Sequence, residues 1–106
     1  MKSLSILIPI YNEEESLQAL FDELKLSFEN NQSIEIIFIN DGSSDMSQKV
    51  IENEIANHST WKLINLYRNY GKSVALQSGI DIASNELIAT LAVSYTHLTL
   101  PTRLPV

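Results

Sequence analysis

The sequence predicts an α/β protein built on a doubly wound, mostly parallel sheet. Two stretches, Leu4–Ile10 and Ile34–Ile39, are almost continuously apolar, which is typical of parallel strands buried on both faces. Each stretch ends in a polar, turn-forming cluster, and apolar residues at helical spacing follow it. Alternation of strand and helix implies right-handed crossovers, and therefore a parallel sheet.

The composition indicates one small folded domain and argues against several partners. The chain has 106 residues, 44% of them hydrophobic, with 3 Gly and 3 Pro, which favours a globular fold over disorder. Its net charge of −6 argues against nucleic acid as a partner, because a phosphate backbone calls for a basic stripe. It has no cysteine, so disulfides and thiolate chemistry are excluded. No apolar stretch reaches the roughly 20 residues that span a bilayer, so we expect no membrane span and a cytoplasmic location.

Two helices are expected after the first and second strands. Asn12 is predicted as the N-cap of the first helix, with Glu15 completing a capping box. The buried face of this helix is defined by apolar residues at helical spacing, namely Leu17, Leu20, Phe21, Leu24 and Phe28. The turn at residues 41–44 leads into the second helix. Its buried face is marked by Met46, Val50, Ile51 and Ile55.

The second half of the interpretable chain repeats the pattern. Trp61–Tyr67 is predicted as a third strand, and a third helix is expected after residues 68–71. The inward face of this helix is predicted to carry Val74, Leu76, Ile80 and Ala83. A fourth strand is expected over Glu86–Leu91. The composition then changes, because no carboxylate and no lysine occurs from Leu87 to the last residue.

The polar clusters at the strand ends predict a binding site. Residues 11–13 follow the first strand, and residues 40–45 follow the second. In an open parallel sheet, ligands bind in the crevice beyond the carboxyl ends of the strands. Both clusters should therefore face one crevice with their carboxylates and free backbone amides, which indicates a nucleotide site.

Three segments carry a resemblance to a known family. Residues 8–14 read IPIYNEE, residues 39–45 read INDGSSD, and residues 66–79 read LYRNYGKSVALQSG. In this order they resemble the opening motifs of family 2 glycosyltransferases, and most of all the polyprenol-phosphate enzymes similar to dolichol-phosphate mannose synthase. The resemblance implies a Rossmann-like GT-A fold, cut off here after the fourth strand. It also implies a nucleotide-diphospho-sugar donor, inversion at the anomeric carbon and a lipid-phosphate (polyprenol-phosphate) acceptor.

The resemblance also assigns roles to six residues of this chain. The nucleotide-binding residues that it implies are Pro9, Tyr11, Glu13, Asp41, Arg68 and Lys72. The first two would flank the base and ribose, with Glu13 close by. Asp41 would accept a hydrogen bond from an N–H of the base, and the last two would contact the nucleotide from the third motif. No catalytic residue is expected within this chain.

The chain departs from the family pattern after the fourth strand. Family members carry an Asp-x-Asp motif there, which holds Mg²⁺ or Mn²⁺ on the donor diphosphate. Here residues 92–94 read AVS, so a divalent metal is expected for the intact enzyme while its ligands are absent from this chain. We expect residues 1–91 to be the nucleotide-sugar-binding half of the domain, and residues 92–106 to be an artefactual tail foreign to the family. The intact enzyme would act at the inner face of the membrane.

Simpler interpretations stand beside several of these assignments. Asp45 can be explained as a residue that initiates the second helix, and Lys72 as a solvated surface lysine. His58 and His97 show no partner pattern for catalysis or metal binding. The alternative function is a non-catalytic nucleotide-binding or receiver-like module, which would require a phosphorylatable Asp after the third strand. Residues 67–69 supply none.

Overall fold

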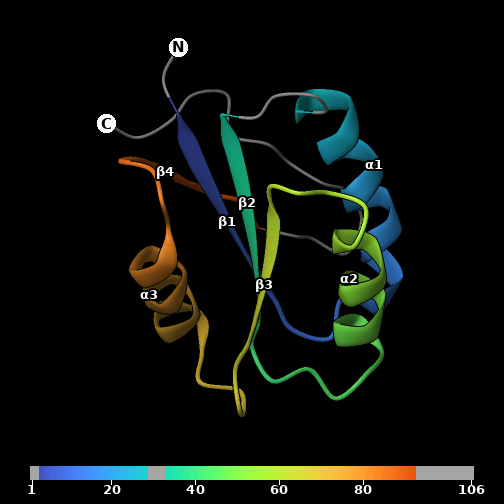
Figure 1. The fold of residues 1–106 in the computed structure, drawn as a ribbon. Helices are drawn as coiled ribbons and strands as arrows, with labels where there is room; N and C mark the ends of the chain where they lie inside the picture. The colour runs from blue at the N-terminus through green and yellow to red at the C-terminus, as the bar shows by residue number, and fades with distance from the viewer. Residues whose placement is uncertain (1–2, 29–32, 93–106) are drawn as a thin grey trace.

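A four-stranded parallel sheet with helices on both faces forms the protein (Figure 1). The computed structural model describes residues 3–28 and 33–92. The elements are β1 (Leu4–Ile10), η1 (Glu14–Ser16), α1 (Leu17–Phe28), β2 (Ile34–Asn40), α2 (Ser47–Ile55), β3 (Trp61–Asn65), α3 (Lys72–Ile82) and β4 (Leu87–Thr90). The sheet order is β3-β2-β1-β4, and each of these pairs is parallel. The predicted doubly wound α/β fold is therefore confirmed.

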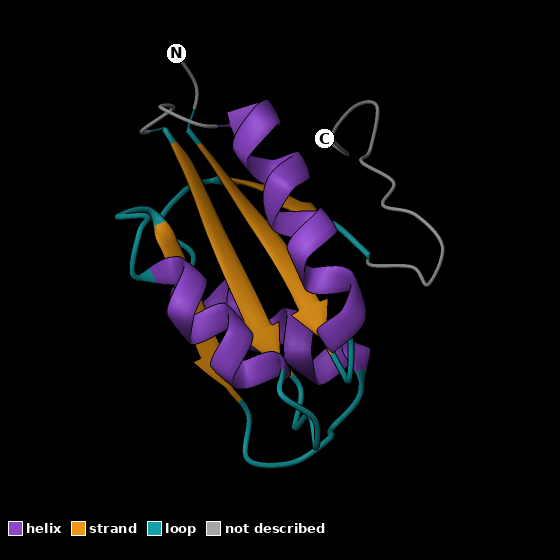
Figure 2. Cartoon of the chain, turned by 90° about the vertical axis from the view of Figure 1, so that its right-hand side faces the viewer, coloured by secondary structure: helices purple, strands orange, loops and turns teal. Residues whose placement is uncertain are grey.

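The helices divide between the two faces of the sheet. Helices α1 and α2 cover one face, and α3 covers the other (Figure 1). Figure 2 views the sheet from the side of α1 and α2, which lie in front of the strands. Because β1 and β2 are covered on both faces, their apolar residues can be buried whichever way they point, as the continuous apolar runs predict. None of the helices in the described residues has the length and apolarity to cross a bilayer.

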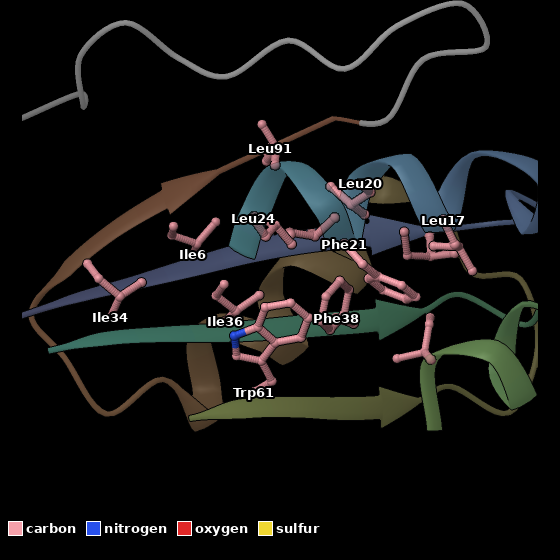
Figure 3. Packing of buried hydrophobic residues seen from close by; sticks show 13 residues of the cluster. Ile6, Leu17, Leu20, Phe21, Leu24, Ile34, Ile36, Phe38, Trp61 and Leu91 are labelled. Carbon is pink, nitrogen blue, oxygen red and sulfur yellow. The ribbon is translucent and has the colours of Figure 1, made fainter. Parts of the chain in front are cut away.

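The larger of the two hydrophobic clusters lies on the face of the sheet that α1 covers. Figure 3 shows Phe21 of α1, Phe38 of β2 and Trp61 of β3 packed together. The ring of Phe21 meets the ring of Phe38 edge-on with centroids 5.7 Å apart, and Trp61 lies 5.6 Å from Phe38. Aromatic pairs of this geometry contribute about 0.5–1.5 kcal/mol beyond the area that they bury. This cluster fixes α1 over β2 and β3.

The predicted start of α1 is wrong. Asn12 is not an N-cap, because its φ is +51° and its side chain bonds to the loop after β2. The chain enters α1 through the 3₁₀ turn η1, whose N-cap residue Glu13 makes no capping side-chain bond. No capping box with Glu15 therefore forms. The buried face of the helix is nevertheless as predicted, with Phe28 partly buried at its end.

The predicted inward faces of the other two helices are correct in part: Leu76 and Ala83 of the α3 set and Val50, Ile51 and Ile55 of the α2 set pack against the core, while three residues do not. In α3, Val74 and Ile80 are 47% and 45% exposed, while the small residues Ala75 and Gly79 face the sheet. A Cβ on Gly79 would lie 3.0 Å from Ile39, so the helix packs too closely for large side chains along that line. Before α2, Met46 is 52% exposed and precedes the first helical residue.

The strand boundaries differ slightly from the predicted ones. Strand β3 ends at Asn65 rather than at Tyr67, because its partner β2 ends at Asn40. Strand β4 covers Leu87–Thr90 within the predicted range. Of the predicted tail, only Ala92 belongs to the described residues, and the rest lies outside them.

A buried carboxylate joins the strands at the opposite end of the sheet from their carboxyl ends. Glu35 of β2 is 6% exposed and accepts hydrogen bonds from Ser5 Oγ of β1 at 2.7 Å and from the backbone N–H of Ser84 at 2.9 Å. It also forms an ion pair with Lys62 of β3. Burial alone would raise the pKa of Glu35, but the hydrogen bonds from Lys62, Ser84 and Ser5 outweigh it and lower the pKa to about 2. One side chain thus joins three strands and the α3–β4 loop.

We expect Glu35→Gln to destabilise the protein and to flatten its acid unfolding profile. A pKa lowered from 4.5 to about 2 corresponds to about 3 kcal/mol of stability at neutral pH, at about 1.4 kcal/mol per unit. Because the folded pKa is the lower one, this stability is present above pH 4.5 and is lost as the pH falls toward 2. Chemical denaturation from pH 7 to pH 2 measures it. The exposed Glu23→Gln in α1 serves as the control, and equal profiles for both variants would contradict the assignment.

Candidate functional site

A pocket of about 240 Å³ opens at the carboxyl ends of the strands. Its lining residues are Pro9, Tyr11, Glu13, Asp41, Asn69, Gly71, Lys72 and Ala92. Five of the six residues assigned from the sequence line this pocket, and Arg68 is the exception. The guanidinium of Arg68 instead lies 5.8 Å from the ring centre of Tyr70, on the same loop. The structure therefore brings three separate sequence motifs to one hollow.

Pro9 explains why the sheet opens at this point. The backbone N–H of Leu91 donates to the carbonyl of Leu7 at 3.0 Å, which is the last hydrogen bond between β1 and the chain beyond β4 within residues 3–28 and 33–92. The next bond would need an N–H from residue 9, since alternate residues of a strand face the same neighbour. Proline has none. The pairing ends, and Pro9 and Ala92 become two walls of the pocket.

Seven hydrogen bonds join residues 12–14, which follow β1, to residues 43–47, which follow β2, and we call this set the loop latch. The side-chain oxygen of Asn12 accepts the backbone N–H groups of Ser44 at 2.8 Å and Asp45 at 3.3 Å, and also the Ser44 hydroxyl at 3.4 Å. The other four bonds are Asn12 N–H to Ser43 Oγ, Glu13 N–H to Ser47 Oγ, Glu14 N–H to Asp45 Oδ2 and Met46 N–H to Glu14 Oε1. The latch holds together the two loops that supply Tyr11, Glu13 and Asp41.

The carboxylate of Asp41 is buried under the loop that follows β3. It is 4% exposed, and it accepts the N–H of Tyr70 at 2.9 Å on Oδ1. Its Oδ2 accepts the N–H of Gly71 at 3.0 Å and the side-chain amide of Asn69 at 3.1 Å. A carboxylate offers about four acceptor positions, so one position on Oδ1 is left for a further donor. Asp41 therefore anchors the third motif and keeps one acceptor beside the pocket.

Gly42 permits the close approach of the second and third motifs. Its φ is +74°, and a Cβ at this position would lie 2.4 Å from the backbone of both Arg68 and Asn69. Only glycine fits, because any side chain would collide with backbone atoms that cannot rotate away. Gly71, with φ of +103°, has nothing within 4 Å of the corresponding position.

Helix α3 begins at the pocket and brings positive charge to it. Lys72 is its first residue and is exposed, so its side chain is free to reach a ligand. The first N–H groups of a helix lack partners within the helix and carry its positive dipole end. An anion placed between Lys72 and this helix end is favoured by both.

Two carboxylates near the pocket have opposite pKa shifts. Burial and the negative charge of Asp45 both raise the pKa of Glu13. Burial would also raise the pKa of Asp45, but hydrogen bonds from Ser47 and Glu14 outweigh it and lower this pKa. Because Asp45 Oδ1 accepts the N–H of Ser47 at 2.9 Å, the simpler role of initiating α2 accounts for it.

The described residues do not form a metal site. No group of three or more Asp, Glu, His or Cys side chains in residues 3–28 and 33–92 is arranged to hold an ion. The Asp41 carboxylate is already engaged by three donors, and Ala92 contributes no ligand atom to the pocket. His58 stacks on Trp61 with its Nε2 2.9 Å from Glu54, and it does not line the pocket.

The fold is that of GT-A glycosyltransferase domains. The PcManGT mannosyltransferase of Pyrobaculum calidifontis, solved with GDP-Man and Mn²⁺, superposes with a TM-score of 0.74 at 18% identity over 82% of this chain and 26% of its own. Staphylococcus aureus TarS 1-349, solved with UDP, gives a TM-score of 0.76 at 22% identity over 87% of this chain and 27% of its own. At these identities the likeness concerns the fold alone.

The chain belongs to glycosyl transferase family 2, whose family model matches residues 5–92. It is 41% identical over 95 residues to the undecaprenyl-phosphate 4-deoxy-4-formamido-L-arabinose transferase of Yersinia pestis, and 41% identical over 86 residues to an uncharacterised glycosyltransferase of Synechocystis. These matches cover 86% and 80% of this chain but only 28% and 27% of the relatives. The expected family is confirmed, and the receiver-like alternative has no support.

Sequence reasoning missed three pocket residues and one structural residue. Asn69, Gly71 and Ala92 line the pocket, and the first two are donors to Asp41. Both lie inside the third motif, so the motif itself is the signal that could have found them. Asn12 fits the sequence pattern of a helix cap, although it belongs to the loop latch.

We expect Gly42→Ala to lower the free energy of unfolding more than Gly71→Ala does. Both substitutions place a side chain at positive φ, which costs about 1–3 kcal/mol. Only Gly42→Ala adds a collision with the backbone of residues 68 and 69, and forced overpacking costs a further ~1–3 kcal/mol. Urea denaturation of the two variants measures the difference between their free energies of unfolding. Equal losses would contradict this expectation, because they would mean that the backbone at residues 68 and 69 can move away from residue 42 without a loss of stability.

Proposed function

We propose that this chain binds the nucleotide part of a nucleotide-diphospho-sugar donor, as the donor-binding half of a glycosyltransferase. The observation that carries the proposal is the convergence of Pro9, Tyr11, Glu13, Asp41 and Lys72 on one pocket at the carboxyl edge of a parallel sheet. Ligands of open parallel sheets bind at this edge. Two solved structures with this fold support the ligand class, since PcManGT was solved with GDP-Man and TarS with UDP.

Each of the pocket's walls suits a different part of a nucleotide. The remaining acceptor position on Asp41 Oδ1 suits an N–H of the base. Because Asp41 is buried, leaving this position without a donor costs free energy. Pro9 and Tyr11 present apolar surface on which a base and ribose can pack, and Tyr11 is 48% exposed. The amino end of α3 with Lys72 suits the diphosphate. Arg68 lies outside the lining, and its contact with the nucleotide requires a different conformation of its exposed side chain.

The acceptor is proposed to be a lipid phosphate. The Yersinia pestis relative is named as an undecaprenyl-phosphate sugar transferase, which supports a polyprenol phosphate for the longer protein of which this chain is one part. A phosphate oxygen is already anionic, so it can attack the anomeric carbon with less help from a general base than a hydroxyl needs. Such an acceptor also supports action at the cytoplasmic face of a membrane.

A divalent cation is proposed for the longer protein and not for this chain. The Mn²⁺ bound together with GDP-Man in the PcManGT structure supports a metal for the donor, and the choice between Mg²⁺ and Mn²⁺ stays open. The side chains of residues 3–28 and 33–92 do not fit a metal, because they form no cluster of ligand groups. Residues 1–91 are therefore proposed as the donor-binding part, with metal and acceptor contacts supplied by other residues of a complete enzyme.

We expect Lys72→Gln to weaken binding of UDP or GDP without changing stability. A hydrogen bond to a charged group is worth about 1.5–3 kcal/mol, and exposure of Lys72 reduces this, so the expected loss is about three- to tenfold in affinity. Titration of the ¹⁵N-labelled chain with each nucleotide measures the dissociation constant. The matched control is Lys49→Gln, an exposed lysine of α2, which should bind like the unmodified chain. The difference in affinity between Lys72→Gln and the unmodified chain should become smaller at high salt. Equal affinities for Lys72→Gln and Lys49→Gln would show that Lys72 does not belong to the site.

We expect the affinity of this chain for a nucleoside diphosphate to be independent of added Mg²⁺ or Mn²⁺. The described residues offer the cation no ligand cluster, so it cannot bridge protein and diphosphate. Calorimetric titrations with UDP, with and without each cation, test this. The same samples incubated with a nucleotide-sugar donor and a polyprenol phosphate should yield no transfer product. A metal-dependent gain in affinity would contradict the assignment of the metal ligands to other parts of a complete enzyme.

A further inference from the structure

Asn12 has a left-handed backbone conformation and a side chain that binds a distant loop. Its φ of +51° lies in the left-handed region, where asparagine is better tolerated than most residues. At the same time its side-chain oxygen accepts the N–H groups of Ser44 and Asp45, which lie more than 30 positions further along the chain. Asn12 is exposed, so its conformation is not stabilised by burial of apolar surface.

The position of Asn12 links the two halves of the pocket wall. Its neighbours Tyr11 and Glu13 both line the pocket, and Asp41 lies on the loop that Asn12 binds. The left-handed residue turns the chain between Tyr11 and Glu13, and its side chain fixes that turn to the neighbouring loop. Loss of either property would let the Tyr11–Glu13 segment leave the conformation that faces Asp41.

We propose that Asn12 is a positioning residue for nucleotide binding. It would act without touching the ligand, by holding Tyr11, Glu13 and Asp41 in one preformed wall. The inference rests on the proposed function, and it adds that affinity depends on the latch. If the latched state is only a fraction of the population, the apparent dissociation constant rises by the inverse of that fraction.

Three substitutions separate the two properties of Asn12. Asn12→Asp keeps a side-chain acceptor and tolerates positive φ, while Asn12→Gly keeps the backbone conformation and removes the acceptor. Asn12→Ala removes both. Asn53→Ala, on the exposed face of α2, serves as the control. Binding of UDP and GDP is measured by titration at a temperature where circular dichroism shows every variant to be folded, and amide exchange of Ser44 and Asp45 is followed without ligand.

We expect rescue by the conservative variant. Asn12→Gly should bind the nucleotide about five- to tenfold more weakly, because two backbone donors lose their partner. Asn12→Ala should bind more weakly still, and Asn12→Asp should stay within about threefold of the unmodified chain. Faster amide exchange at Ser44 and Asp45 should accompany the weaker binding.

Other outcomes would overturn the inference in distinguishable ways. If Asn12→Gly and Asn12→Ala bind as tightly as the unmodified chain, the nucleotide site does not depend on the latch. If all three variants, including Asn12→Asp, lose affinity in proportion to their melting temperatures, Asn12 is a stability residue only. If the unmodified chain binds neither UDP nor GDP, the proposed function fails first, and the positioning role fails with it.

Discussion

The pairing register of β1 and β2 is the constraint on which the rest of the structure depends. The strands pair residue for residue from Leu4 with Ile34 to Ile10 with Asn40, so both end at the same level of the sheet. Because the strands are parallel, the chain leaves both of them at one edge and begins its two polar loops side by side. The loop latch, the hydrogen bonds to Asp41 and the pocket all depend on this common end of the two strands. A shift by one residue would turn Glu35 away from Ser5 and send buried side chains to the opposite face.

The pocket of an acidic protein can accept an anion because its own carboxylates are engaged locally. Asp41 is compensated by three N–H donors, and Asp45 by donors from Ser47 and Glu14. Hydrogen bonds from the protein thus compensate most of both charges, and the free acceptor position on Asp41 Oδ1 is what remains beside the pocket. Glu13 is the carboxylate whose pKa is raised, so its charge is the one that a bound anion would most readily reduce by protonation. Lys72 and the start of α3 then face the ligand against less opposing charge.

Much of the fold and part of the site could be predicted from the sequence, for physical reasons that differ between residues. Pro9 and Asp41 could be placed at the pocket because continuous apolar strands fix where a parallel sheet ends. Asn12 could not, because positive φ and bonds to residues more than 30 positions away leave no local pattern. Helical spacing alone did not reveal that Val74 and Ile80 are exposed, because it does not say which face of the helix packs on the sheet. The small residues at positions 75, 79 and 83 were the available signal, since a close approach of helix to sheet needs them.

Under the proposed function, the place of Ala92 separates donor binding from sugar transfer at this edge of the sheet. Strand β4 pairs with β1 only as far as Thr90 opposite Leu7, and the bond from Leu91 to Leu7 is followed by Pro9, which donates nothing. Position 92 is thereby released from the sheet into the pocket wall, where its methyl group adds no charge and no ligand atom. The contacts proposed for base and ribose come from residues 9–13 and 41, which do not depend on that side chain. Affinity for a nucleotide can therefore persist where the means to stabilise a departing diphosphate is missing.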